Sequence, residues 1–322
     1  MAVGSVDPAV AALSEAALRC TTTDPDGVAI AWRCWPGAAG DESTALVLLH
    51  GSYGSWTHWI RNIPALQRRC AVVCPDVPGF GDSGDPPSER TPDAMGRTLA
   101  SGLLAWRART GIPVKRWFIG GFSLGSVYAG WMARALVDLH AETVARVALV
   151  SPGGLGPRDE RDLGMRRVRS DADAIEQRDA HRHNLSAVMF GCAGAIDETA
   201  ICIQSENVSR ARFRGPFAPS PDFLLDALAG TSWPVLGVWG DRDAFDLDVA
   251  VRRTALLGVR PDARALVIAG AGHWVPYEAA EEVNAALADW FGKIPYFEHV
   301  IRRTVDSSAL TATMMPGSCI GE

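Results

Sequence analysis

A serine at a predicted sharp turn is the residue of this chain best suited to covalent chemistry. The run Gly121-Phe-Ser-Leu-Gly125 follows an apolar segment, residues 117–119, and opens a stretch whose apolar residues recur at helical spacing from Leu124. A G-x-S-x-G run between a strand and a helix is typical of a nucleophile elbow, where a tight turn exposes the serine hydroxyl. Both flanking positions are glycine because such a turn leaves no room for side chains. We therefore predict that Ser123 is a nucleophile.

A serine hydroxyl needs a base within hydrogen-bond reach, and the base needs a third group to orient it. His273 follows the apolar run 265–269, and Gly240-Asp-Arg-Asp243 follows the apolar run 235–239. Both would lie at the carboxyl ends of parallel strands, where sites form in open α/β sheets. We predict His273 as the base and favour Asp243 over Asp241 as the acid.

Acyl chemistry also needs hydrogen-bond donors for the oxyanion that forms during the reaction. The backbone N–H of Leu124 is one candidate, because it directly follows the nucleophile. The run His50-Gly-Ser-Tyr-Gly54 follows the apolar segment 45–49 and contains small residues, so Ser52 is predicted to supply the second donor. Loss of one such donor costs about 3–4 kcal/mol in the transition state. His50 is predicted to orient this loop rather than to react.

Aromatic side chains are concentrated beside the predicted site loops. They indicate a bulky apolar or aromatic acyl substrate, with Tyr53, Trp56, Phe122 and Trp274 predicted to contact it. The alternative is that most of these rings pack in the core, since aromatic residues near a site serve both purposes.

The elements that would position these residues alternate between strand and helix. Thr91 and Pro92 provide an N-cap and a first helical residue for one of the helices. Alternation of this kind predicts an α/β fold, a mostly parallel sheet flanked by helices. The predicted strands are 21–24, 28–34, 45–49, 71–74, 117–119, 144–150, 235–239 and 265–269, the first two forming a hairpin, and the predicted helices are 56–69, 91–109, 124–139 and 278–291, with Asp246 and Asp248 at the start of another.

Composition excludes several other classes of protein. The 322 residues include 31 basic and 37 acidic side chains without a basic block, which argues against a nucleic-acid partner. Seven cysteines without a C-x-x-C pattern indicate reduced thiols, and no apolar run approaches the length of a membrane span. No cluster has metal-ligand spacing. We expect a cytoplasmic protein with no metal, no cofactor and no membrane partner; the sequence does not address its oligomeric state.

The motifs together resemble the α/β-hydrolase fold superfamily, over residues ~21 to 292. The resemblance rests on His50-Gly51, Gly121–Gly125, Gly240–Asp243, Gly272-His273 and the run Asp76-Val-Pro-Gly-Phe-Gly-Asp-Ser83, which that family uses as a structural turn. It implies a discontinuous core, 21–151 and 232–292. The inserted residues 152–231, predicted to be helical, would form a lid over the site. Residues 1–20 and 293–322 form an N-terminal lead and a C-terminal tail.

The resemblance implies a serine hydrolase that cleaves a carboxylic ester or related activated carbonyl through an acyl-enzyme. Serine at position 123 argues against haloalkane dehalogenases and epoxide hydrolases, whose nucleophile is a carboxylate. Carbon–carbon bond hydrolases of ring-fission dienoic acids are the first alternative, and His273-Trp274 followed by Glu278 is similar to that group. In such an enzyme Arg210, Arg212 and Arg214 would bind a substrate carboxylate; the other interpretation is that they form a solvated face of the lid. The second alternative is a hydrolase-fold protein that binds a ligand without turnover.

Overall fold

The computed structural model describes residues 7–38, 43–139, 144–157, 161–213, 221–246 and 248–292. Its centre is an eight-stranded sheet in the order β1-β2-β4-β3-β5-β6-β7-β8. β2 pairs antiparallel with both of its neighbours, and the remaining pairs are parallel. The strands are β1 (Leu18–Thr23), β2 (Ala29–Trp35), β3 (Thr44–Leu49), β4 (Ala71–Pro75), β5 (Arg116–Phe122), β6 (Val144–Val150), β7 (Val235–Gly240) and β8 (Arg264–Ile268).

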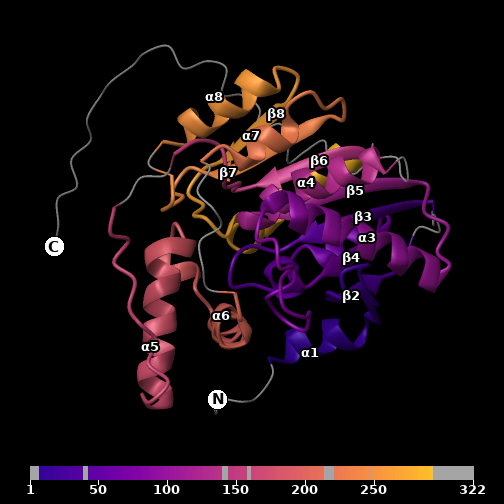
Figure 1. The fold of residues 1–322 in the computed structure, drawn as a ribbon. Helices are drawn as coiled ribbons and strands as arrows, with labels where there is room; N and C mark the ends of the chain where they lie inside the picture. Colours follow the sequence, from indigo (N-terminus) through magenta and orange to yellow (C-terminus); the bar gives the residue numbers. More distant parts are fainter. Residues whose placement is uncertain are drawn as a thin grey trace, which may run out of the picture.

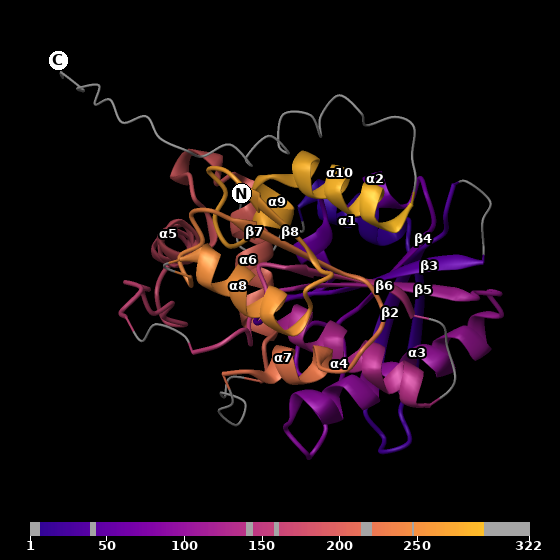
Figure 2. The ribbon, with the colours of Figure 1, turned by 90° about the horizontal axis from the view of Figure 1, so that it is seen from above.

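Helices cover both faces of this sheet, which confirms the predicted fold class (Figure 2). One face carries α3 (Pro92–Thr110), α4 (Leu124–Asp138), α7 (Phe223–Leu228) and α8 (Val249–Val259). The other carries α2 (Ile63–Leu66), α9 (Val275–Glu278) and α10 (Ala280–Phe291). Each layer has its own apolar core because strands such as β3, β4 and β7 are buried along their whole length.

Most predicted elements are present, with shifted ends. α3 begins as predicted, with Thr91 accepting a hydrogen bond from the N–H of Ala94 and Pro92 in first position. The sheet begins at Leu18 rather than at residue 21, and a helix, α1 (Pro8–Glu15), lies within the predicted N-terminal lead. The tail 293–322 lies outside the described residues.

The prediction of one helix over residues 56–69 is wrong. A 3₁₀ turn, η1 (Trp56–Trp59), is followed by α2, which is four residues long. Pro64 lies in the first turn of α2 and cannot donate a backbone hydrogen bond, so a helix cannot run through it unbroken. The predicted helix over 278–291 is present as α10, which begins two residues later, at Ala280, and a short helix, α9, precedes it.

The described residues between β6 and β7 form helices and loops, as predicted. They include α5 (Ala174–Asn184), the π-helical turn η2 (Leu185–Met189), the 3₁₀ turn η3 (Ala193–Ala195), α6 (Glu198–Arg210) and α7. Figure 1 shows α5 and α6 beside the sheet rather than within its layers. None of the helices described is long and apolar enough to cross a membrane.

Candidate active site

Ser123 occupies the sharp turn between β5 and α4. Its backbone has φ 53° and ψ −120°, a left-handed conformation that non-glycine residues rarely adopt. A Cβ at Gly121 would overlap the backbone of Gly125, and one at Gly125 would overlap the carbonyl of Leu49. Both glycines are therefore required for the turn, and the strained serine is held at its tip.

The structure brings Ser123, His273 and Asp243 together in one hydrogen-bonded chain. Ser123 Oγ lies 2.9 Å from His273 Nε2, and His273 Nδ1 lies 2.7 Å from Asp243 Oδ2. All three side chains are buried, with at most 8% of the residue surface exposed. A carboxylate can only accept, so Nδ1 carries the ring proton and Nε2 is free to accept the serine proton. This arrangement can activate a hydroxyl for attack on a carbonyl.

The neighbouring carboxylates have other partners. Asp241 accepts a hydrogen bond from the N–H of Gly270 at 2.6 Å and does not reach the imidazole of His273. Asp248 is the N-cap of α8, as predicted, and accepts a hydrogen bond from the N–H of Ala250. Asp246 lies just before the N-cap of α8 and forms an ion pair at 2.6 Å with Arg252 on that helix.

The loop after β3 lies against the serine. An added Cβ at Gly51 would be 3.0 Å from the Cβ of Ser123, so the loop backbone can approach the site closely. Leu124 begins α4, and Ser52 is exposed on the loop next to Gly51. These positions are compatible with backbone donors near the serine, and the oxyanion role of Ser52 and Leu124 stays a prediction.

Two buried histidines hold the peptide groups of Gly51. His50 Nε2 accepts a hydrogen bond from the N–H of Val77 at 2.8 Å, so its Nδ1 carries the proton and donates to the carbonyl of Gly51 at 2.8 Å. The Gly51 N–H donates to His58 Nδ1 at 3.2 Å. Burial lowers the pKa of His50, and lowers that of His58 well below its usual range, with the nearby His50 and His273 adding to the effect on His58. Both rings are neutral supports for the loop.

No sequence pattern indicated a role for His58, although it lies only eight residues beyond His50. Its ring contacts Phe122 and Trp274, with centroids 5.3 and 5.2 Å away. Phe245 was missed too, and its ring lies edge-on to His273 at 4.5 Å.

The four aromatic residues predicted to contact substrate have different positions. Tyr53 is 40% exposed and has φ 51°, so its ring is available at the loop surface. Trp56, Phe122 and Trp274 are at most 4% exposed and pack in the core beside the site. Packing explains these three rings, and their contact with substrate stays a prediction.

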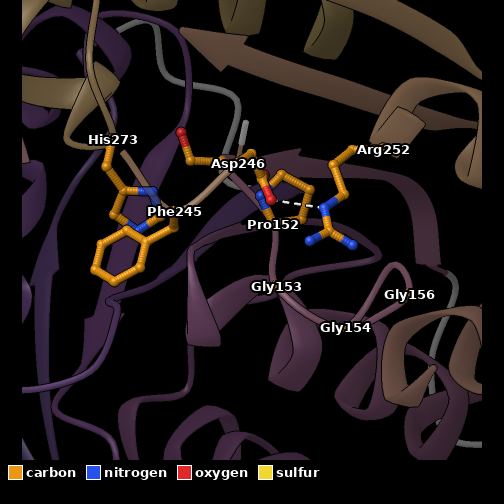
Figure 3. A pocket seen from close by; sticks show the side chains of 9 residues that line it. Pro152, Gly153, Gly154, Gly156, Phe245, Asp246, Arg252 and His273 are labelled. Carbon is orange, nitrogen blue, oxygen red and sulfur yellow. Dashed lines mark hydrogen bonds and ion pairs between the residues drawn. The ribbon is translucent and has the colours of Figure 1, made fainter. Parts of the chain in front are cut away.

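A small cavity borders His273 on the side of Phe245 and Asp246 (Figure 3). Its volume of about 10 Å³ corresponds to one water-sized sphere. Arg252 also lines it, but this guanidinium binds Asp246 and the carbonyls of Leu155 and Pro157. The cavity is therefore too small for an acyl group and has no uncommitted cation.

The arginines predicted as possible carboxylate ligands are also engaged. Arg210 pairs with Asp82 and Glu206. Arg212 binds Asp85 and the backbone carbonyls of residues 81, 83 and 84, and Arg214 lies outside the described residues. Within the described ranges, no three His, Cys, Asp or Glu side chains are grouped so as to hold a metal ion.

The profile of the alpha/beta hydrolase family matches residues 46–286, well over half of the 322 residues. The chain belongs to the alpha/beta hydrolase family. This membership confirms the family predicted from the motifs and supports the prediction that the protein is a hydrolase.

Two relatives are similar over most of this chain. The dihydrolipoyllysine-residue acetyltransferase component of the acetoin cleaving system from Pseudomonas putida is 26% identical over 274 residues, covering 80% of this chain and 66%, just under two thirds, of that protein. The 2-hydroxy-6-oxo-6-phenylhexa-2,4-dienoate hydrolase from Burkholderia cepacia is 26% identical over 273 residues, covering 77% and 88%. Among solved structures, naproxen esterase (carboxylesterase NP) from Bacillus subtilis has a TM-score of 0.66 at 20% identity, covering 86% and 92%, a likeness of fold.

Proposed function

We propose that this alpha/beta hydrolase cleaves a carboxylic ester or a related activated carbonyl through a covalent serine intermediate. The observation that carries the proposal is the chain of hydrogen bonds from Ser123 through His273 to Asp243, with the serine on a strained turn. A hydroxyl held in this way can pass its proton to the neighbouring imidazole as it attacks, and the turn points its oxygen toward a carbonyl carbon.

The reaction follows from the tautomer of His273. Ser123 Oγ attacks the carbonyl carbon while its proton passes to His273 Nε2, and Asp243 stabilises the imidazolium that forms. The N–H groups of Leu124 and Ser52 are proposed to bind the resulting oxyanion. His273 then gives its proton to the leaving alkoxide, and water, deprotonated by the same ring, releases the acid from Ser123.

An ester is favoured over a ring-fission dienoic acid by the arginines. Arg210, Arg212 and Arg252 already bind carboxylates or carbonyl groups, so a substrate carboxylate would have to displace those partners. The exposed Tyr53 and the ring of Phe245 beside His273 instead favour an apolar or aromatic acyl group.

We also propose that residues 152–231 act as a lid. α6 is attached directly to the loop that follows the predicted oxyanion donor, because Asn207 accepts a hydrogen bond from Ser55 and donates one to Thr57. Since these contacts lie within a few residues of Ser52, changes in this insertion are expected to alter substrate preference.

A fluorophosphonate probe tests the proposal, because it reacts only with an activated serine. The wild type should be labelled and should hydrolyse aryl and alkyl esters, whereas Ser123→Ala should lose labelling and about a million-fold in kcat. Ser126→Ala is a matched control: this second serine, on α4, bonds to the carbonyl of Gly121 and lies outside the proposed chain of proton transfer.

Two results would contradict the proposal. Cleavage of a ring-fission dienoic acid with a kcat/KM far above that for any ester would favour the carbon–carbon hydrolase. Absence of both labelling and turnover across a broad acyl panel would favour a ligand-binding protein.

A further inference from the structure

Glu278 lies at the end of α9, five residues beyond His273, and has no part in the proton transfers above. Its carboxylate accepts backbone hydrogen bonds from two segments that are far apart in the sequence. Oε2 accepts from the N–H of Gly191 at 2.9 Å and of Gly272 at 2.7 Å, and Oε1 accepts from the N–H of Cys192 at 2.8 Å. One side chain therefore joins the helical insertion to the loop that carries His273.

The two segments are in direct backbone contact at this point. An added Cβ at Gly272 would overlap the backbone N of Gly191, and one at Gly191 would be 2.8 Å from the N of Gly272. The N–H of Trp274 donates to the carbonyl of Met189 at 2.7 Å. The N–H groups of the residues before and after His273 are thus held, one by Glu278 and the other by the insertion.

We propose that Glu278 is a positioning residue, which sets the place of the His273 imidazole by fixing residue 272 against residues 191 and 192. The inference rests on the proposed function for its effect on catalysis. Hydrogen bonds from N–H groups to a carboxylate are about twice as strong as those between neutral groups, so a charged acceptor suits a joint that holds three donors. Because the proton transfers need His273 within hydrogen-bond reach of two partners, small displacements of this loop reduce the rate.

Glu278→Gln replaces one accepting oxygen by an amide that can only donate, so at least one of the three N–H groups loses its partner. We expect kcat for an aryl ester to fall about 100-fold, while KM changes less than about threefold, because the substrate contacts are unaltered. Glu281→Gln, the same change on an exposed residue of α10, should leave both constants at the wild-type value.

A second variant and a second measurement separate positioning from general loss of structure. Glu278→Asp keeps the charge but is shorter by one methylene, and should lose about tenfold in kcat. In folded Glu278→Gln, amide hydrogen exchange should become faster at Gly191, Cys192, Gly272 and Trp274 and unchanged in α3. The Nδ1 proton of His273, observed by NMR, should shift as its bond to Asp243 is disturbed.

The outcomes distinguish this proposal from the function on which it rests. If the wild type turns over no ester, the proposed function fails, and hydrogen exchange and NMR alone then test whether Glu278 positions His273. Faster exchange at residues 272 and 274 with a shifted His273 proton then supports positioning. Wild-type kcat in Glu278→Gln, or unchanged exchange and an unchanged His273 proton, would overturn it.

Discussion

The two loops that meet at Ser123 are held by opposite kinds of chemistry. In the loop after β3, the carbonyl and N–H of Gly51 are bound by the neutral imidazoles of His50 and His58. In the loop after β8, the N–H groups of Gly270 and Gly272 are bound by the carboxylates of Asp241 and Glu278. Each pairing suits its surroundings, because both imidazoles are buried among aromatic rings, whereas the carboxylates bind N–H groups beside the partly exposed Gly191 and Gly270.

The two loops are therefore expected to respond differently to pH and to substitution of the side chains that hold them. Neutral imidazoles can accept hydrogen bonds, and burial lowers the pKa of both rings, so acid should lower the free energy of unfolding before it charges the Gly51 loop. The His273 loop should instead depend on the identity of its two carboxylate side chains, whose hydrogen bonds to backbone N–H groups are strong.

Apart from loss of the nucleophile, the largest expected effect comes from the acid that touches His273. Asp243→Asn should lower kcat about 10⁴-fold, because the amide favours the wrong tautomer of the ring. Asp241→Asn is a matched control two residues away, whose side chain binds a backbone N–H and not the imidazole. Steady-state kinetics on one ester would decide between them, and equal losses in the two variants would contradict the assignment of Asp243.

A smaller loss is expected when the backbone contact beside His273 is disturbed. Gly272→Ala places a methyl group in overlap with the backbone N of Gly191, so one of the two backbones must shift. We expect about a 100-fold fall in kcat/KM, together with a lower Tm. Gly258→Ala, inside α8 with open space around it, should keep full activity and slightly raise stability.

Gly54→Ala makes the corresponding change in the other loop, where the new methyl group would meet the ring of His58 and lie 2.8 Å from the carbonyl oxygen of Gly51. The backbone atoms that an added Cβ meets at Gly272 are closer than this oxygen, so Gly54→Ala should lose less activity than Gly272→Ala. A larger loss at Gly54 would show that the imidazole-held loop is the less adaptable of the two.

The sequence was sufficient for the parts of the molecule that local patterns determine. Continuous apolar runs predicted the buried strands, and the glycines around Ser123 predicted the turn that the structure contains. His273 and Asp243 could be placed near that serine because parallel strands end at one edge of a sheet.

What the sequence did not reveal are contacts between distant segments. Glu278 meets Gly191 across 87 positions, and nothing in the periodicity of either segment indicates that pairing. Trp274 Nε1 donates to the carbonyl of His58 in the 3₁₀ turn η1, where the sequence predicted part of one longer helix. Tertiary packing decides such details, and local propensity does not.

The smallest expected effect is a change in how stability depends on pH. The usual histidine pKa is 6.5, and burial lowers the pKa of both His50 and His58 in the folded protein. As pH falls below 6.5, the unfolded chain takes up a proton at each position that the folded chain does not, so the free energy of unfolding decreases. Each histidine contributes up to about 1.4 kcal/mol per pH unit.

His58→Asn removes one of these protons from the unfolded state. Urea unfolding at pH 7.5 and 5.5 should therefore show a smaller acid loss in this variant than in the wild type, even though its stability at pH 7.5 is lower because Gly51 has lost a partner. Identical acid losses in the two proteins would mean that the imidazole of His58 is not kept neutral by the fold, and that the two loops do not differ in the way proposed.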